Sequence, residues 1–225
     1  MERVDYVAPT GSDSLVASVS VDEKLLDEAN EISAATEYLR IWEPAAPMVV
    51  TGRSSRAERE VDAAECERRG IPVVQRSSGG AAIVTGPGCL MYAVVLSFSL
   101  RPKLRDITRA HEFVLDTMIA ALQPLVGGRK IERAGTSDLV LANGDDISSA
   151  RKFSGNSLRV KRTHCLYHGT LLYDFDLSLL SKCLQMPPRK PEYRGERSHT
   201  DFVANLPVSR EALTEAIESA WPCDS

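Results

Sequence analysis

Short apolar segments separated by glycine- and proline-containing turns constrain the fold of this chain more than any other sequence feature. The clearest is Leu90–Phe98, a continuous apolar run that follows a Gly-Pro-Gly turn at 86–88. Pro44 and Pro47 predict a tight hairpin-like turn between the first two segments, and an Asn-Gly pair at 143–144 marks another hairpin. Such short connections favour antiparallel pairing. The expected strands are Tyr38–Trp42, Met48–Thr51, Ile71–Val74, Ala81–Val84, Leu90–Phe98, Lys130–Arg133, Asp138–Leu141, Lys152–Val160 and Cys165–Tyr173.

Helical periodicity appears between these strands. In the segment from Ile107 to Leu122, apolar residues recur every three or four positions, and the glycines at 127–128 follow as a stop signal. The other expected helices are Val21–Ile32, Arg56–Arg69, Leu177–Leu184 and Arg210–Ala220. Strands joined by tight turns, with helices interspersed, predict an α+β fold with a mixed, largely antiparallel sheet flanked by helices. With 225 residues, 43% of them hydrophobic, the chain is expected to form one domain over residues 1–225.

Charge and cysteine content argue against several functional classes. The net charge of -4 disfavours general nucleic-acid binding, which needs clustered Lys and Arg. The five cysteines are widely spaced and include no CxxC pair, so we expect neither a disulfide framework nor a zinc site. The first residues carry no signal-peptide pattern, and the longest apolar run is too short to cross a bilayer. We therefore expect a soluble, cytoplasmic protein without membrane or nucleic-acid partners.

A glycine-containing segment at residues 75–82 is the first candidate for ligand binding. It follows a predicted strand, and its small residues let the backbone approach a ligand and present N–H groups to a phosphate or carboxylate. Arg76 would add a charged fork for an oxyanion. The segment lacks the ending of a P-loop and the spacing of a dinucleotide fingerprint. A plain polar hairpin loop would have much the same sequence.

Three further segments each carry one ionisable candidate. Lys152 could neutralise a carboxylate that is being converted to an acyl phosphate, or it could be an exposed lysine on an edge strand. His168 could carry a proton, although its spacing alone favours a satisfied structural histidine. Asp138 could steer an amine or hold a metal, or it could cap a turn. None of these residues identifies a function by itself.

Taken together and in this order, the segments resemble the lipoate–protein ligase A family. The resemblance covers roughly residues 25–206, which is nearly the whole chain. It implies the biotin/lipoyl ligase catalytic fold, a mixed sheet with helices. The segments that carry it are Leu39–Glu43, Gly52–Arg53, Arg76–Ala82, Ser137–Leu139, Lys152–Asn156, His168–Leu172 with Asp176–Leu177, and Val203–Leu206.

The resemblance implies a ligase that works in two steps. ATP and Mg²⁺ convert lipoate to lipoyl-adenylate, and a lysine of a lipoyl carrier domain then takes the acyl group. The carrier would belong to a 2-oxoacid dehydrogenase or be the glycine-cleavage carrier protein. The sequence shows no Ser–His–Asp arrangement, and none is needed because the carrier amine is the nucleophile.

The same resemblance implies roles for particular residues. Lys152 would be catalytic, contacting both the acyl carboxyl and the phosphate, and Asp138 would lie near the nucleotide or amine and is the candidate Mg²⁺ ligand. The implied acyl-binding residues are Arg76, Ser78, Gly79, Gly80, Tyr92, His168, Gly169 and Thr170. The implied nucleotide-binding residues are Ala81, Ala82, Asp138, Ser154, Gly155 and Asn156.

The sequence departs from the family pattern at several polar positions. The first arginine of the glycine loop is Gln75 here, and the third glycine is Ala81. Thr200 and Phe202 stand where a late segment of the family has arginines, which removes cations from the expected nucleotide region. Because little sequence follows the region of resemblance, we expect a single catalytic domain without the C-terminal accessory domain of many family members. An accessory subunit supplied as a separate chain is therefore among the expected partners.

Two alternatives stay open at this point. One is an octanoyl or lipoyl transferase that works without ATP through a cysteine thioester, for which Cys165 and Cys89 are the candidates, although each also fits a buried structural thiol. The other is a non-catalytic protein that binds lipoate or a lipoyl domain. Retention of Lys152 argues against such a binder.

Overall fold

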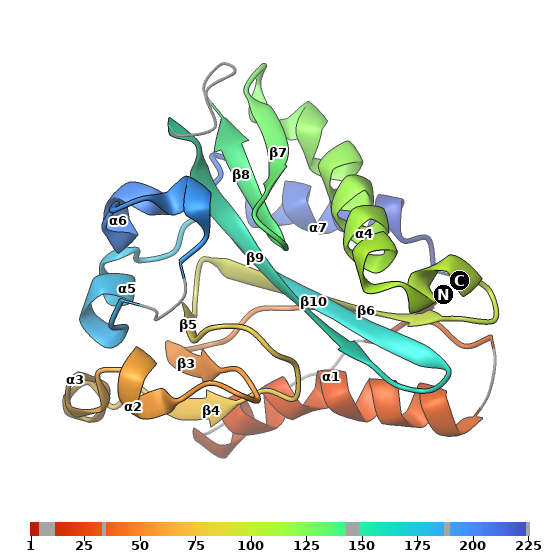
Figure 1. Cartoon of the computed structure of the whole chain (residues 1–225), viewed down its shortest axis with the longest axis horizontal. Coiled ribbons are helices and arrows are strands. Elements are labelled where there is room, and N and C mark those ends of the chain that lie inside the picture. The colour runs from red at the N-terminus through yellow and green to blue at the C-terminus, as the bar shows by residue number, and fades with distance from the viewer. Residues whose placement is uncertain (5–11, 33–34, 143–148, 187–189, 224–225) are drawn as a thin grey trace.

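Strands of the described residues form two sheets of unequal size (Figure 1). The structure is a computed structural model that describes residues 1–4, 12–32, 35–142, 149–186 and 190–223. The strands are β1 Glu2–Arg3, β2 Tyr38–Trp42, β3 Met48–Thr51, β4 Val73–Gln75, β5 Ile83–Thr85, β6 Cys89–Ser97, β7 Lys130–Ala134, β8 Asp138–Ala142, β9 Arg151–Val160 and β10 His164–Leu172. The α-helices are α1 Ser12–Ile32, α2 Ala57–Glu60, α3 Ala63–Arg68, α4 Ile107–Leu122, α5 Ser178–Cys183, α6 His199–Phe202 and α7 Arg210–Ala220. Short 3₁₀ turns are η1 Pro102–Arg105, η2 Gln123–Val126 and η4 Glu192–Arg194.

Within the described residues, the larger sheet has seven strands in the order β1-β2-β6-β10-β9-β8-β7, and the smaller has three in the order β4-β3-β5. In the large sheet β1 runs parallel to β2 and the other described pairs are antiparallel, and in the small sheet β3 runs parallel to β4 and antiparallel to β5. The expected α+β fold with a mixed, largely antiparallel sheet is confirmed, and its strands divide between two sheets.

The predicted hairpin between β2 and β3 is wrong. β2 pairs with β1 and β6, whereas β3 pairs with β4 and β5, so the intervening link carries the chain from one sheet to the other. Prolines mark a turn in the chain, but they do not determine which strand becomes the partner. The other expected strands form within about two residues of their predicted ends. The Asn-Gly pair at 143–144 lies outside the described residues.

The predicted helix over 56–69 is interrupted in its middle. Val61 is extended there and forms an isolated antiparallel bridge with Leu184, which separates α2 from α3. Asp62 then caps α3, because its side chain accepts a hydrogen bond from the backbone N–H of Glu65. The charged pattern alone could not reveal this tertiary pairing.

Burial on both faces explains the continuous apolar run of β6. Leu90, Tyr92 and Val94 belong to the core cluster that includes side chains of α4 and α7, whereas Ala93 and Val95 pack with side chains of α1. Figure 1 shows α1 on one side of the large sheet and α4 with α7 on the other. Full burial of a large apolar side chain contributes about 1.5–3 kcal/mol. This central strand is therefore a rigid base for the site described below.

Within the described part of the chain, none of the helices combines the length and the apolar character required to cross a membrane.

Candidate active site

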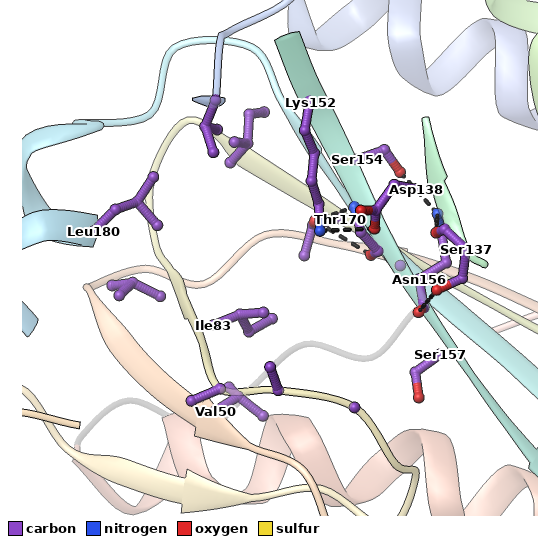
Figure 2. A pocket seen from close by; sticks show the side chains of 18 of the residues that line it. Val50, Ile83, Ser137, Asp138, Lys152, Ser154, Asn156, Ser157, Thr170 and Leu180 are labelled. Carbon is purple, nitrogen blue, oxygen red and sulfur yellow. Dashed lines mark hydrogen bonds and ion pairs between the residues drawn. The ribbon is translucent and has the colours of Figure 1, made fainter. Parts of the chain in front are cut away.

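A cavity of about 290 Å³ lies where the two sheets meet. Its walls come from β3 and β5 of the small sheet, from β6, β9 and β10 of the large sheet, and from α1 and the segment 191–203. Figure 2 shows apolar side chains such as Val50, Ile83 and Leu180 on one side and the polar group around Lys152 and Asp138 on the other. Such a cavity suits a ligand with an apolar tail and a charged head.

An ion pair between Lys152 and Asp138 marks the polar side. Lys152 Nζ lies 2.7 Å from Asp138 Oδ1, and both side chains are mostly buried, with 26% and 13% exposed. The register between β8 and β9 shifts here, so that Leu139 opposes Ser154 while Val140 opposes Lys152. Such a bulge redirects side chains next to it. The lysine then extends across β9 toward Asp138, which begins β8 (Figure 2).

Gly155 makes room for this ion pair. A Cβ atom at position 155 would lie 2.9 Å from Lys152 Nζ and 3.8 Å from Asp138 Oδ1. Any larger side chain would therefore press on the lysine amine. Glycine is therefore required at this position because a side chain would clash with Lys152, and not because the backbone forms a turn there.

Asn156 is the centre of a second, neutral network. Its side-chain N–H donates to Ser137 O at 2.8 Å and to Ser154 Oγ at 3.1 Å, and its Oδ1 accepts from Tyr92 OH at 2.6 Å. A Cβ at Gly169 would lie only 1.8 Å from Asn156 Oδ1, so glycine at this position is required for the network. The network positions the polar wall of the cavity through buried contacts.

The guanidinium of Arg76 turns away from the expected oxyanion and onto its own loop. It donates to the carbonyl oxygens of Gly79 at 2.6 Å, Ala81 at 3.0 Å and Val50 at 3.1 Å. Burial lowers the pKa of Arg76 to about 10, although the charge of Glu60 opposes this shift. Arg76 therefore shapes the loop around the cavity, and the residue itself lines the wall.

A hydrogen-bonded chain joins this loop to α1. Ser78 Oγ lies 2.6 Å from His168 Nε2, and His168 Nδ1 lies 2.9 Å from Asp22 Oδ2. Arg40, only 1% exposed, pairs with the other oxygen of Asp22 at 2.6 Å. Burial raises the pKa of Asp22, but the hydrogen bonds and charges of His168 and Arg40 outweigh it, and the net shift is downward.

The hydrogen bonds that join Ser78, His168 and Asp22 correct the expectation that the sequence contains no Ser–His–Asp arrangement. The three residues lie far apart in the sequence, and only the fold brings them together. Ser78 is fully buried and is not among the residues that line the cavity. Its hydroxyl therefore has no access to a ligand in this structure, and the arrangement is suited to holding the glycine loop rather than to nucleophilic attack.

Most of the predicted site residues gather at this cavity. Those that line it are Lys152, Arg76, Gly80, Ala81, Ala82, Asp138, Ser154, Gly155, Asn156, His168, Gly169 and Thr170. Ser78 and Tyr92 are buried behind this wall and contact its residues, whereas Gly79 is exposed and accepts hydrogen bonds from Arg76. Their individual functional roles stay predictions.

The two cysteines considered as nucleophiles lie elsewhere. Cys89 and Cys165 are both fully buried, and neither lines the cavity. Desolvation raises the pKa of each thiol to about 12. A reactive cysteine needs an accessible thiolate, so both have the properties of structural thiols.

Sequence reasoning missed four ionisable residues that line the cavity in the described part of the chain: Asp22, Glu60, Arg194 and His199. Asp22 lies on the helix face formed by Val21, Leu25 and other apolar residues, and a carboxylate on such a face was the available signal. Glu60 accepts the backbone N–H of Ala82 at 2.7 Å and so supports the glycine loop. Arg194, 4% exposed, comes from the late segment and returns a cation to the region where arginines were expected.

The donor set limits how a metal could be held. Within the described residues there is no group of three or more His, Cys, Asp or Glu side chains arranged for a metal ion. Asp138 is one carboxylate beside the ion-pair lysine. A single carboxylate combined with substrate phosphates and water suits Mg²⁺, which rarely needs an all-protein cage. The residues present therefore fit a magnesium ion brought with a nucleotide.

Comparison with known proteins agrees with this geometry. The family model for the lipoyl protein ligase A/B catalytic domain matches residues 15–219. The chain belongs to this family. The match includes the whole region of sequence resemblance and confirms it.

Solved structures related to the lipoyl ligase family share the fold. One is the bipartite lipoate protein ligase of Thermoplasma acidophilum, described with its E2 lipoyl domain, with 24% identity, a TM-score of 0.72, and coverage of 92% of this chain and 79% of that one. Another is a proposed lipoate protein ligase from T. acidophilum with bound lipoic acid, with 22% identity, a TM-score of 0.74, and coverage of 100% and 87%. A third is lipoate-protein ligase A bound with ATP, with 22% identity, a TM-score of 0.70, and coverage of 91% and 78%. These likenesses confirm the expected fold of the catalytic domain.

Proposed function

We propose that this chain is a lipoate–protein ligase that activates lipoate with ATP and transfers the lipoyl group to a lysine of a lipoyl carrier domain. The observation that carries the proposal is the position of Lys152, which lies with Asp138 on the polar side of a cavity whose other side is apolar. An acyl chain in the apolar part would bring its carboxylate to the lysine amine. Family membership and solved relatives with lipoic acid or ATP support this assignment.

The proposed chemistry begins with activation of the acid. The lipoate carboxylate attacks the α-phosphorus of ATP, forms lipoyl-adenylate and releases pyrophosphate. Negative charge spreads over the phosphate and carboxyl oxygens, and the Lys152 amine on the polar side of the cavity is the cation proposed to stabilise it. Arg194, which also lines the cavity, is a second cation for the nucleotide. Mg²⁺, held by phosphate oxygens and Asp138, would shield the phosphate charge.

The second step transfers the acyl group to the carrier. The neutral lysine amine of the carrier attacks the acyl carbonyl, forms the amide and loses a proton to solvent, while AMP leaves with the electron pair of the broken mixed anhydride. Because the carrier amine is the nucleophile, the protein needs none of its own. Lys152 stabilises charge on the leaving phosphate. His168, Gly169 and Thr170 border the acyl path on β10.

The proposal extends to partners and organisation. The described residues would form one catalytic domain that acts on carriers of 2-oxoacid dehydrogenases or on the glycine-cleavage carrier protein. The bipartite organisation of the T. acidophilum relative supports a separate accessory subunit. Five free cysteines support a reducing compartment such as the cytoplasm.

Incubation with lipoate, ATP and Mg²⁺, without any acceptor, tests the proposal directly. We expect mass spectrometry to detect lipoyl-adenylate together with pyrophosphate, because the first step needs no carrier. The reaction is repeated with octanoate to compare the two acyl chains. If neither acid is adenylated, by the chain alone or after addition of an accessory subunit, the ligase assignment fails.

The cysteine-dependent alternative predicts a different result with mutants. We expect Cys89→Ala and Cys165→Ala to retain adenylation and carrier transfer within about twofold, because both thiols lie outside the cavity. Initial rates are measured for each variant and for the double variant, with unfolding curves as a check on the fold. Loss of transfer in a well-folded cysteine variant would favour the thioester route.

A further inference from the structure

The carboxylate of Asp138 has a second donor besides the catalytic lysine. Tyr193 OH donates to Asp138 Oδ2 at 2.7 Å, while Lys152 Nζ occupies Oδ1 at the same distance. Each oxygen of the carboxylate therefore has its own partner. Tyr193 comes from η4, which belongs to the segment 191–204, here called the late segment, and lies 55 residues away from Asp138 in the sequence.

Tyr193 is held in this position from several directions. Its ring packs on Phe202 with centroids 5.2 Å apart, and Arg197 donates to its carbonyl oxygen at 2.6 Å. Burial and the nearby charge of Asp138 raise the pKa of Tyr193, so the hydroxyl keeps its proton and acts as a donor. A side chain held in this way is preorganised toward Asp138.

The same late segment also holds the backbone of the lysine. Lys152 forms an isolated parallel bridge with Val203, and Ala204 N donates to Lys152 O at 2.9 Å. The segment therefore contacts Lys152 directly through its main chain and indirectly through the counterion of the amine. This double contact links Tyr193 to the reaction centre.

We propose that Tyr193 is a positioning residue that divides the charge of Asp138 and so keeps the Lys152 amine available to the substrate. The inference rests on the proposed function in taking Lys152 as the catalytic amine. A hydrogen bond to one carboxylate oxygen weakens the attraction that the other oxygen exerts on the lysine. When Lys152 turns to the substrate, Tyr193 still donates a hydrogen bond to Asp138. The buried carboxylate therefore keeps a partner.

Tyr193→Phe removes only the donor and keeps the ring. We expect this variant to lower kcat for adenylate formation about tenfold, the size expected for one hydrogen bond to a charged group, with little change in KM for lipoate.

A second measurement on the same variant, Tyr193→Phe, does not depend on ligase activity. Lys152 is acetylated with acetic anhydride at fixed pH, and mass spectrometry compares its rate with that of Lys130 in the same molecule. The Lys152 rate should fall several-fold, because Asp138 then holds the amine more strongly.

Asp138→Asn provides the background that separates positioning from structure. In this background, Tyr193→Phe should change the Lys152 acetylation rate less than twofold, because the charge that Tyr193 divides is gone. Tyr173→Phe is the matched control, since Tyr173 donates to the carboxylate of Glu43 outside the cavity. It should leave Lys152 acetylation unchanged.

Several outcomes would overturn the proposal. An unchanged or faster Lys152 rate in Tyr193→Phe contradicts it, as does an equal effect in the Asp138→Asn background or in Tyr173→Phe. If the wild-type protein forms no adenylate but the acetylation pattern is as expected, the proposed function fails while the positioning role of Tyr193 stands.

Discussion

Lys152→Ala should reduce lipoyl-adenylate formation by about 10²–10³-fold, because one fixed cation at the developing charge contributes an effect of this size. Among the described residues, Lys152 is the only lysine that lines the cavity. Its Nζ lies 2.7 Å from Asp138 Oδ1 on the polar side. Initial rates of adenylate formation measure the effect. Circular dichroism and unfolding curves establish that the variant is folded.

Lys130→Ala is the control for loss of a lysine as such. Lys130 begins β7, and its side chain is 59% exposed and lies outside the cavity. We expect this variant to keep wild-type rates. A folded Lys152→Ala protein with normal turnover would overturn the assignment of the site, whatever the behaviour of Lys130→Ala.

Asp22→Asn should destabilise the folded protein by about 3–5 kcal/mol at neutral pH, because it removes the carboxylate charge that faces the buried guanidinium of Arg40. Asp22 is 3% exposed and Arg40 is 1% exposed. The substitution also weakens the hydrogen bond that holds His168 and, through Ser78, the glycine loop. Urea unfolding curves measured at pH 7 give the difference in free energy of unfolding.

The pH dependence of this difference has a definite sign. The pKa of Asp22 is lowered in the folded protein from its ordinary value of 3.8. Its contribution to stability is therefore complete above pH 3.8 and is lost as pH falls through the lower folded-state value. The difference in free energy of unfolding between the wild-type protein and Asp22→Asn should be constant near neutral pH and should become smaller in acid.

Asp27→Asn is the matched control on the same helix. Asp27 pairs with Lys161 at the surface, and its side chain is 44% exposed. An exposed ion pair contributes less than about 1 kcal/mol. Similar losses from the two substitutions, or a gap for Asp22→Asn that does not change in acid, would show that the Asp22–Arg40 pair lacks the energetic role given to it.

Some of the site could be predicted because the evidence is local in the chain. Lys152, Gly155 and Asn156 lie within five consecutive residues, and the resemblance of such a segment to a family can be recognised before any contact is known. The structure explains two of these residues geometrically. Gly155 leaves room for the lysine side chain, and Asn156 forms hydrogen bonds with three neighbouring residues. The amphipathic pattern of α4 likewise predicted its bounds, Ile107–Leu122.

Other features depend on which segments meet in three dimensions. Asp22 and His168 are 146 residues apart, and Tyr193 reaches Asp138 from a segment that the sequence left without an assigned element. Arg76 was expected to face an oxyanion, but the carbonyls of its own loop surround its guanidinium. No local period encodes these choices, because a side chain turns toward the partners that packing supplies.

By itself, the sequence determined the α+β class, most element positions, the family and a lysine, Lys152, that lines the cavity. Periodicity and short motifs are local properties, and they persist whatever the rest of the chain does. Tertiary structure alone decided that β2 and β3 enter different sheets and that a cavity forms where those sheets meet. It also decided that Asp138 is shared between Lys152 and Tyr193. Strand partners and buried polar pairs arise from contacts between distant segments, and their energies exist only once the whole chain has packed.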